Sequence, residues 1–130
     1  MSKEDIELAK QARQNAYAPY SNYYTGAALR TKNGHIYLGC NIENHGIQGI
    51  CAERTAFAKA LSKGEREFES IAIVGAIKGK EPTEKCMPCG YCRQFMSEFV
   101  NNDFKIRTVD QDNNIEEFTI SELLPHSFKI

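Results

Sequence analysis

Apolar residues recur along the chain at two spacings, and the spacing predicts where helices and strands lie. Residues 2–17 carry apolar side chains at helical spacing, at Ile6, Leu8, Ala9, Ala12 and Ala16. Ser2 and Asp5 are candidates for capping the start of this helix. The following segment, 18–22, contains Pro19 and is expected to end it.

Two further segments have a helical pattern. Residues 52–63 are rich in alanine and place Phe57 and Leu61 on one face, and the pattern stops before Gly64. Residues 89–101 repeat at the same spacing. We expect this second helix to bury four apolar side chains: Phe95, Met96, Phe99 and Val100.

The strands are indicated by shorter runs. Residues 26–31 and 35–40 flank Lys32-Asn33-Gly34, which predicts a hairpin closed by an Asn-Gly turn. Residues 71–77 form a continuous apolar run, as expected of a central strand covered on both faces. Two more strands are predicted at 105–110 and 115–120, and residues 121–124 resemble a capped final turn.

The resulting order is α-β-β-α-β-α-β-β-α, with a glycine-containing loop at 44–50. Strands interleaved with helices in this way favour an α/β fold. We therefore expect a three-layer α-β-α sandwich around a mixed five-stranded sheet, formed by a single domain over residues 1–130.

Composition narrows the class of protein further. Hydrophobic residues make up 42% of the chain and charged residues 25%, which is typical of a soluble globule. The polar N-terminus has no signal-peptide pattern and no run could span a bilayer, so we expect a cytoplasmic protein that binds no membrane. The formal net charge of −1 argues against a nucleic-acid backbone as partner.

Cysteine spacing carries the candidate chemistry. Cys86, Cys89 and Cys92 form overlapping C-x-x-C pairs, and Cys51 precedes the helical segment that contains Glu53. Two ligands from a C-x-x-C pair and one from Cys51 would satisfy a zinc site whose fourth position stays open to water. Spacing alone leaves open a structural zinc site with a fourth thiolate, or a thiol redox pair.

Two neighbouring residue types would complete a catalytic site. Glu53 lies too near Cys51 to be a comfortable fourth ligand, but it could act as general acid and base on a water molecule. Three thiolates around a divalent zinc ion leave a net negative charge. Arg54 and Arg93 are the candidates to offset it.

Together these segments resemble one known family, the small tetrameric cytidine deaminases. The segments that carry the resemblance run in the family's order across nearly the whole chain: PYSNYYTGAAL (19–29), GCNIEN (39–44), CAERTAF (51–57), PCGYCRQ (88–94) and LLPHSF (123–128). The resemblance implies a cytidine deaminase-like fold, hydrolytic removal of ammonia from free cytidine or 2′-deoxycytidine, and one zinc ion per chain.

The resemblance also implies roles for individual residues. Cys51, Cys89 and Cys92 would be the zinc ligands, with Cys86 a bystander. Glu53 would protonate N3 of cytosine and assist the departure of ammonia. Further residues would support the thiolates or the substrate: Arg54 for the thiolates, Asn41 and Glu43 for the ribose hydroxyls, Tyr23 and the backbone of Ala52 and Pro88 for the pyrimidine, and Phe128 for a neighbouring subunit's site in a homotetramer.

Two departures from the family pattern define an alternative. The loop between Asn44 and Cys51 is one residue shorter than usual, and its expected tyrosine is absent, with Ile47 or a neighbour near that place. Tyr23 stands where the family usually has phenylalanine, which adds a hydroxyl beside the base. These changes leave open an alternative substrate, either a modified cytosine nucleoside or a nucleoside antibiotic. His45 of the loop could contact that substrate.

Overall fold

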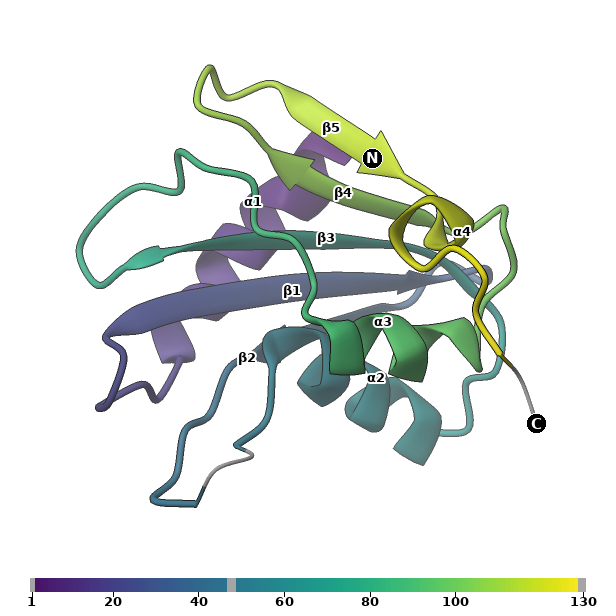
Figure 1. The fold of residues 1–130 in the computed structure, drawn as a ribbon, viewed down its shortest axis with the longest axis horizontal. Coiled ribbons are helices and arrows are strands. Elements are labelled where there is room, and N and C mark those ends of the chain that lie inside the picture. The colour runs from purple at the N-terminus through teal and green to yellow at the C-terminus, as the bar shows by residue number, and fades with distance from the viewer. Residues whose placement is uncertain (1, 47–48, 129–130) are drawn as a thin grey trace.

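The computed structural model describes residues 2–46 and 49–128, which form one five-stranded sheet flanked by helices (Figure 1). The elements in chain order are α1 (Ser2–Ala12), a 3-10 turn η1 (Arg13–Asn15), β1 (Tyr23–Thr31), β2 (Ile36–Cys40), α2 (Ala52–Ser62), β3 (Phe68–Ile77), α3 (Gly90–Ser97), β4 (Lys105–Val109), β5 (Ile115–Phe118) and α4 (Ile120–Leu123). Within the described residues, no helix is both long and apolar enough to cross a membrane.

The sheet is mixed and five-stranded, as the pattern predicts, and its strand order is β2-β1-β3-β4-β5. β1 pairs antiparallel with β2 and β3, β3 pairs parallel with β4, and β4 pairs antiparallel with β5. The continuous apolar run 71–77 lies in the central strand β3, where Ile71, Ile73 and Val74 are completely buried. A strand with helices over both faces must be apolar on both sides, which explains the absence of alternation.

Helices cover both faces of the sheet and so complete the three layers. In Figure 1, α1 lies behind the sheet and α2, α3 and α4 lie in front of it. Ile6 and Ala9 of α1 pack in one core cluster with the β-strand residue Val74. Phe57 of α2 and Met96 of α3 belong to the cluster on the other face. The predicted α/β sandwich is therefore confirmed.

Two strand glycines allow the helices to approach closely. A Cβ on Gly26 would lie 2.1 Å from the carbonyl oxygen of Ala9 in α1. A Cβ on Gly39 would lie 2.4 Å from the carbonyl oxygen of Ala52 and 2.6 Å from the backbone nitrogen of Ala56, both in α2. Side chains at these positions would push the helices away, so Gly39 fixes where the first turn of α2 sits.

The N-terminal helix is shorter than its apolar pattern suggests. α1 ends at Ala12, the 3-10 turn follows, and Ala16 is already extended. The predicted capping role of Asp5 is wrong, because its buried carboxylate accepts two hydrogen bonds from Arg30, at 2.6 and 3.0 Å. A paired carboxylate is the form in which a buried acid is tolerated.

Other boundaries also differ from expectation. The first strand begins at Tyr23 rather than at residue 26, because residues 23–25 pair with the far end of β3. Phe99 lies beyond the end of α3 and is 37% exposed, so its predicted burial is wrong, whereas Met96 and Val100 are buried as expected. Thr119 caps the final turn, with its side chain accepting from the backbone of Glu122.

The close approach at Gly39 generates a stability prediction. Gly39→Ala should lower the free energy of unfolding by about 1–3 kcal/mol, since overpacking forces helix α2 or strand β2 to shift. The control is Gly90→Ala, because nothing lies within 4 Å of a Cβ there. Urea unfolding of the metal-free variants measures both, and equal stability of Gly39→Ala and the parent protein would contradict the packing argument.

Candidate functional site

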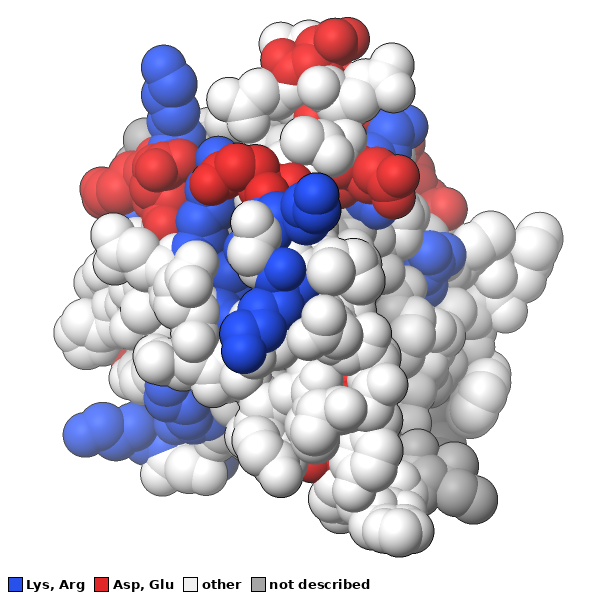
Figure 2. Space-filling model, turned by 90° about the vertical axis from the view of Figure 1, so that its left-hand side faces the viewer, with Lys and Arg blue, Asp and Glu red and all other residues white. Residues whose placement is uncertain are grey.

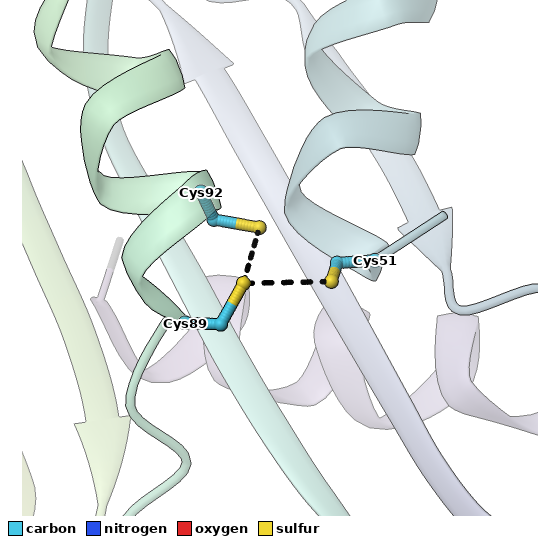
Figure 3. A group of neighbouring side chains, drawn as sticks. All are labelled: Cys51, Cys89 and Cys92. Carbon is cyan, nitrogen blue, oxygen red and sulfur yellow. Dashed lines mark hydrogen bonds between the residues drawn. The ribbon is translucent and has the colours of Figure 1, made fainter. Parts of the chain in front are cut away.

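Three cysteine side chains from the starts of two neighbouring helices converge (Figure 3). Cys51 is the residue before α2, Cys89 is the residue before α3, and Cys92 lies in the first turn of α3. The two helices thus direct their N-terminal ends toward the same three sulfurs. Unpaired N–H groups and the helix dipole favour thiolates at such positions.

The spacing of the sulfurs fits a zinc ion. The Sγ atoms of Cys89 and Cys92 lie 3.5 Å apart, those of Cys51 and Cys89 lie 3.8 Å apart, and all three lie within 4.8 Å of one another. Tetrahedral zinc with Zn–S bonds of about 2.3 Å places its sulfurs about 3.8 Å apart. The distances are too long for a disulfide, and thiolate is a preferred ligand of zinc, so the donor set suits this metal.

Arg54 is the cation that faces the thiolates. Its Nη2 donates to the Sγ of Cys51 at 3.5 Å, and its Cζ lies 4.1 Å from the ring centroid of Tyr91, over the ring. Burial opposes the charge of Arg54, but hydrogen bonds to Cys51 and Cys92 raise its pKa above the usual value. This arrangement can offset the excess negative charge of three thiolates.

Arg93, the other candidate cation, has different partners. Its Nε donates to the carbonyl of Pro88 at 2.7 Å, and its Nη1 donates to the carbonyl of Leu123 at 2.8 Å. The hydrogen bonds of Arg93 therefore do not support the prediction that it offsets the charge of the thiolates. Arg93 instead ties the loop that carries Cys89 to the C-terminal helix α4.

Glu53 lies in the first turn of α2 beside the sulfurs and is only 4% exposed. Burial raises the pKa of its carboxyl to about 7. The hydrogen bond with Cys92, together with Arg54, lowers the pKa of the Cys51 thiol to about 5. A carboxyl group whose pKa is raised thus lies beside a thiol whose pKa is lowered.

A cavity of about 790 Å³ opens next to these groups. Three segments line it: the start of β1 with the turn before it, the loop between β2 and α2, and the loop before α3. Cys51, Glu53 and Cys89 are among the lining residues, so the sulfurs and the buried carboxyl face a space that a small molecule can enter.

The residues predicted to hold a sugar lie on the wall of this cavity. Asn41 is fixed against β1, since its Oδ1 accepts from the backbone of Thr25 at 2.9 Å and its Nδ2 donates to the carbonyl of Tyr23 at 2.9 Å. Glu43 also lines the cavity and keeps its carboxylate directed toward the turn at residues 20–21.

Tyr23 and Cys86 form another part of the wall, next to Gly75. A Cβ on Gly75 would lie 2.9 Å from the hydroxyl of Tyr23 and 3.0 Å from the sulfur of Cys86, so glycine leaves room for both. Burial raises the pKa of the Tyr23 hydroxyl and that of the Cys86 thiol to about 12 each. Cys86 lies outside the sulfur cluster, as expected, but it is a cavity residue rather than a bystander.

The structure brings together most of the predicted site residues. Ala52 lines the cavity, and so does His45 of the loop. Pro88 is buried outside the lining, and its carbonyl is engaged by Arg93. Phe128 is 66% exposed and lies outside the cavity lining of its own chain. The expectation for Ile47 falls outside the described residues.

Charge on the face drawn in Figure 2 is mixed rather than basic. Lysine and arginine side chains alternate there with aspartate and glutamate, and a broad area below them is almost free of charge. Continuous binding of a nucleic-acid strand requires a basic groove that follows the backbone. This face offers isolated cations instead.

Comparison with known proteins gives consistent results. The family model described as "Cytidine and deoxycytidylate deaminase zinc-binding region" matches residues 2–108. The chain is 45% identical over 124 residues to a cytidine deaminase of Sporosarcina psychrophila, covering 95% of this chain and 88% of that protein. It is 46% identical over 125 residues to the enzyme of Halalkalibacterium halodurans, covering 95% of this chain and 90% of that one.

A solved structure agrees with these sequence matches. The crystal structure of cytidine deaminase from Burkholderia pseudomallei superimposes with a TM-score of 0.88 at 40% identity. The match covers 98% of this chain and 99% of that chain. The similarity therefore extends over nearly the whole length of both chains.

The positions of the sulfur atoms predict which cysteines are required for zinc binding. Cys89→Ser should lower zinc affinity by more than about 100-fold, since losing only a partner that supports a ligand costs about 10–100-fold. Cys86→Ser is the matched control, three residues away in the same loop, and should keep one zinc per chain. Metal analysis after dialysis against a chelator measures both. Equal zinc loss in the two variants would contradict the assignment.

Proposed function

The chain belongs to the cytidine and deoxycytidylate deaminase family, and we propose that it hydrolyses free cytidine or 2′-deoxycytidine to the corresponding uridine with release of ammonia. The observation that carries this proposal is the buried carboxyl of Glu53 next to three convergent cysteines, with Glu53, Cys51 and Cys89 lining one cavity. A purely structural zinc site would not require an acid at that position.

Cys51, Cys89 and Cys92 would hold one zinc ion, and two of these cysteines, Cys51 and Cys89, line the cavity. When bound, the ion supplies a Lewis acid that lowers the pKa of the water used in hydrolysis. Arg54 offsets part of the negative charge of the three thiolates through its hydrogen bond to Cys51. The family-implied cofactor therefore matches the residues present.

Glu53 is the residue that we assign to proton transfer. Its carboxylate would accept a proton from the attacking water and deliver it to N3 of cytosine as the new C4–O bond forms. It would then accept the remaining proton of that oxygen and transfer it to the amino group. The C4–N bond breaks, ammonia leaves, and the C4 carbonyl of uracil remains, so atoms and charge balance.

The remaining site residues would hold the nucleoside. We assign Asn41 and Glu43 to the ribose hydroxyls and Tyr23 to the pyrimidine, supported by their positions on the cavity wall. The backbone of Ala52, a cavity residue, is assigned to the polar edge of the base. The Pro88 carbonyl, which lies outside the lining and accepts from Arg93, would take part through its second acceptor site. A site built to accept hydrogen bonds from a sugar discriminates strongly against analogues that lack them, because its own polar groups are then left unpaired.

We infer that the domain, spanning residues 1–130, assembles as a homotetramer in the cytoplasm and acts on a free nucleoside rather than on a nucleic-acid strand. Five free cysteines suit a reducing compartment. Phe128 has an exposed ring, and Gln94 of α3 donates to its carbonyl at 3.4 Å. This placement is consistent with a ring presented to a neighbouring subunit.

The role of Glu53 is tested by Glu53→Gln. Turnover of cytidine should fall by about 10²–10⁴-fold, the usual contribution of a positioned acid and base, while one zinc per chain is retained. The matched control is Glu98→Gln at the exposed end of α3, which should leave turnover unchanged. Full activity of Glu53→Gln, followed by ultraviolet absorbance, would refute the acid/base assignment.

The assembly is tested by complementation between subunits. Phe128→Ala should lower kcat/KM for cytidine about tenfold, as expected when one well-packed aromatic contact is removed. If Phe128 acts in a neighbour's site, mixed assemblies of Phe128→Ala and Glu53→Gln subunits should be more active than either variant alone. Light scattering should give four times the 14.7 kDa chain mass. A monomeric mass, or mixed assemblies that are no more active than the separate variants, would contradict the proposed assembly.

A further inference from the structure

Ser21 lies outside the cavity lining but contacts the wall residue Glu43 directly. The hydroxyl of Ser21 donates to Oε2 of Glu43 at 2.5 Å. The backbone nitrogens of Tyr20 and Ser21 donate to Oε1 at 2.9 and 3.1 Å. Each carboxylate oxygen is therefore anchored separately, which fixes the rotation of the carboxylate as well as its position.

The hydroxyl of Ser21 is itself oriented by a neighbour. Its oxygen accepts a hydrogen bond from the backbone nitrogen of Tyr23 at 3.1 Å. The hydroxyl proton is therefore left to point at Glu43, and the three groups form a chain from the start of β1 to the cavity wall. Hydrogen bonds to a charged acceptor are among the stronger ones, so this contact holds the carboxylate well.

The backbone of Glu43 is held by the same part of the chain. Its nitrogen donates to the carbonyl of Tyr17 at 2.7 Å, and the nitrogen of Tyr17 donates to the carbonyl of Asn41 at 3.0 Å. Segments 17–21 and 41–43 thus lie side by side, and Glu43 is fixed through both its main chain and its side chain. The hydroxyl of Ser21 also lowers the pKa of the Glu43 carboxyl, which favours the ionised, acceptor-only form.

Counting acceptor sites shows what remains for a ligand. An ionised carboxylate has about four acceptor sites, two on each oxygen. Among residues 2–46 and 49–128, Oε1 of Glu43 accepts from two backbone N–H groups, whereas Oε2 accepts from Ser21 alone. With respect to these residues, one acceptor site is left on Oε2, the oxygen that Ser21 orients.

We propose that Ser21 is a positioning residue that sets sugar specificity, by holding Oε2 of Glu43 so that it accepts one particular hydroxyl of the nucleoside. This inference rests on the proposed function. Without the Ser21 hydroxyl, Oε1 keeps its two backbone donors, but Oε2 is released and the carboxylate can rotate about that anchor. The enzyme then still binds the base, while its preference for a substrate that carries the hydroxyl declines.

The experiment assays two forms of the enzyme with a set of nucleosides that differ in their sugar. The parent protein and Ser21→Ala, both zinc-loaded, are assayed with cytidine, 2′-deoxycytidine and 3′-deoxycytidine. For cytidine, Ser21→Ala should raise KM about tenfold with kcat nearly unchanged, since a hydrogen bond to a charged group is lost or weakened. For the analogue that lacks the hydroxyl accepted by Glu43, the same substitution should change KM less than about twofold.

Two matched variants separate positioning from general damage. Ser21→Thr keeps a hydroxyl at the same position and should restore both the KM for cytidine and the discrimination between sugars. Ser62→Ala removes an exposed serine at the end of α2 and should behave like the parent protein. Zinc content and thermal unfolding confirm that each variant is folded.

Each outcome bears on a different claim. A uniform loss of activity with all three nucleosides, or no loss with any of them, would overturn the role of Ser21 while leaving cytidine deamination intact. Failure of Ser21→Thr to recover the discrimination would also count against it. A zinc-loaded parent protein that deaminates none of the three nucleosides would overturn the proposed function, and the role of Ser21 with it.

Discussion

The site depends on one constraint, which is that the N-terminal ends of α2 and α3 meet at the same point on one face of the sheet. Cys51 precedes one helix, and Cys89 precedes the other, so the helix positions decide whether the sulfurs can share an ion. Gly39 sets how closely α2 approaches β2, and Arg93 ties the loop before α3 to the C-terminal helix. A shift of either helix by about 1 Å would spoil tetrahedral geometry at Zn–S distances of about 2.3 Å.

The residues around the N-terminal ends of α2 and α3 determine the charge of the site and its contact with the cavity. Arg54 donates to Cys51, and the ring of Tyr91 covers its guanidinium. Glu53 is buried beside the sulfurs and opens onto the cavity. Glu43 forms another part of the cavity wall, with two described donors to Oε1 and one to Oε2, which keeps an acceptor site for a ligand. The chemistry and the sugar recognition are therefore placed on different segments that face one space.

Local patterns in the sequence predicted most elements, whereas the choice of Cys51, Cys89 and Cys92 came from the family resemblance. The apolar run 71–77 predicted a strand covered on both faces, and it lies in the central strand. The early start of β1 could not be predicted, because residues 23–25 pair with the end of β3, about fifty residues further on. From the sequence, Asp5 resembled a helix cap. Its actual partner, Arg30, could not be predicted because the two residues meet only in the folded protein.

The supporting residues of the site were harder to predict for the same reason. Arg54 follows Cys51 by three positions and Arg93 follows Cys89 by four, so helical spacing places each near a ligand. Their partners distinguish them: Arg54 donates to Cys51, whereas Arg93 donates to the carbonyls of Pro88 and of Leu123, which is 30 residues further along the chain. Ser21 had no signal beyond a turn-forming residue, since Glu43 lies 22 positions away.

The central claim is that hydrolysis requires a metal held by the three convergent cysteines. The most direct measurement is to remove all metal from the protein, return zinc in steps, and follow both uridine and ammonia formed from cytidine. We expect no turnover in the metal-free protein, a linear return of activity that saturates at one zinc per chain, and equal amounts of the two products. Turnover without metal, or a fully zinc-loaded protein that releases neither product, would contradict it.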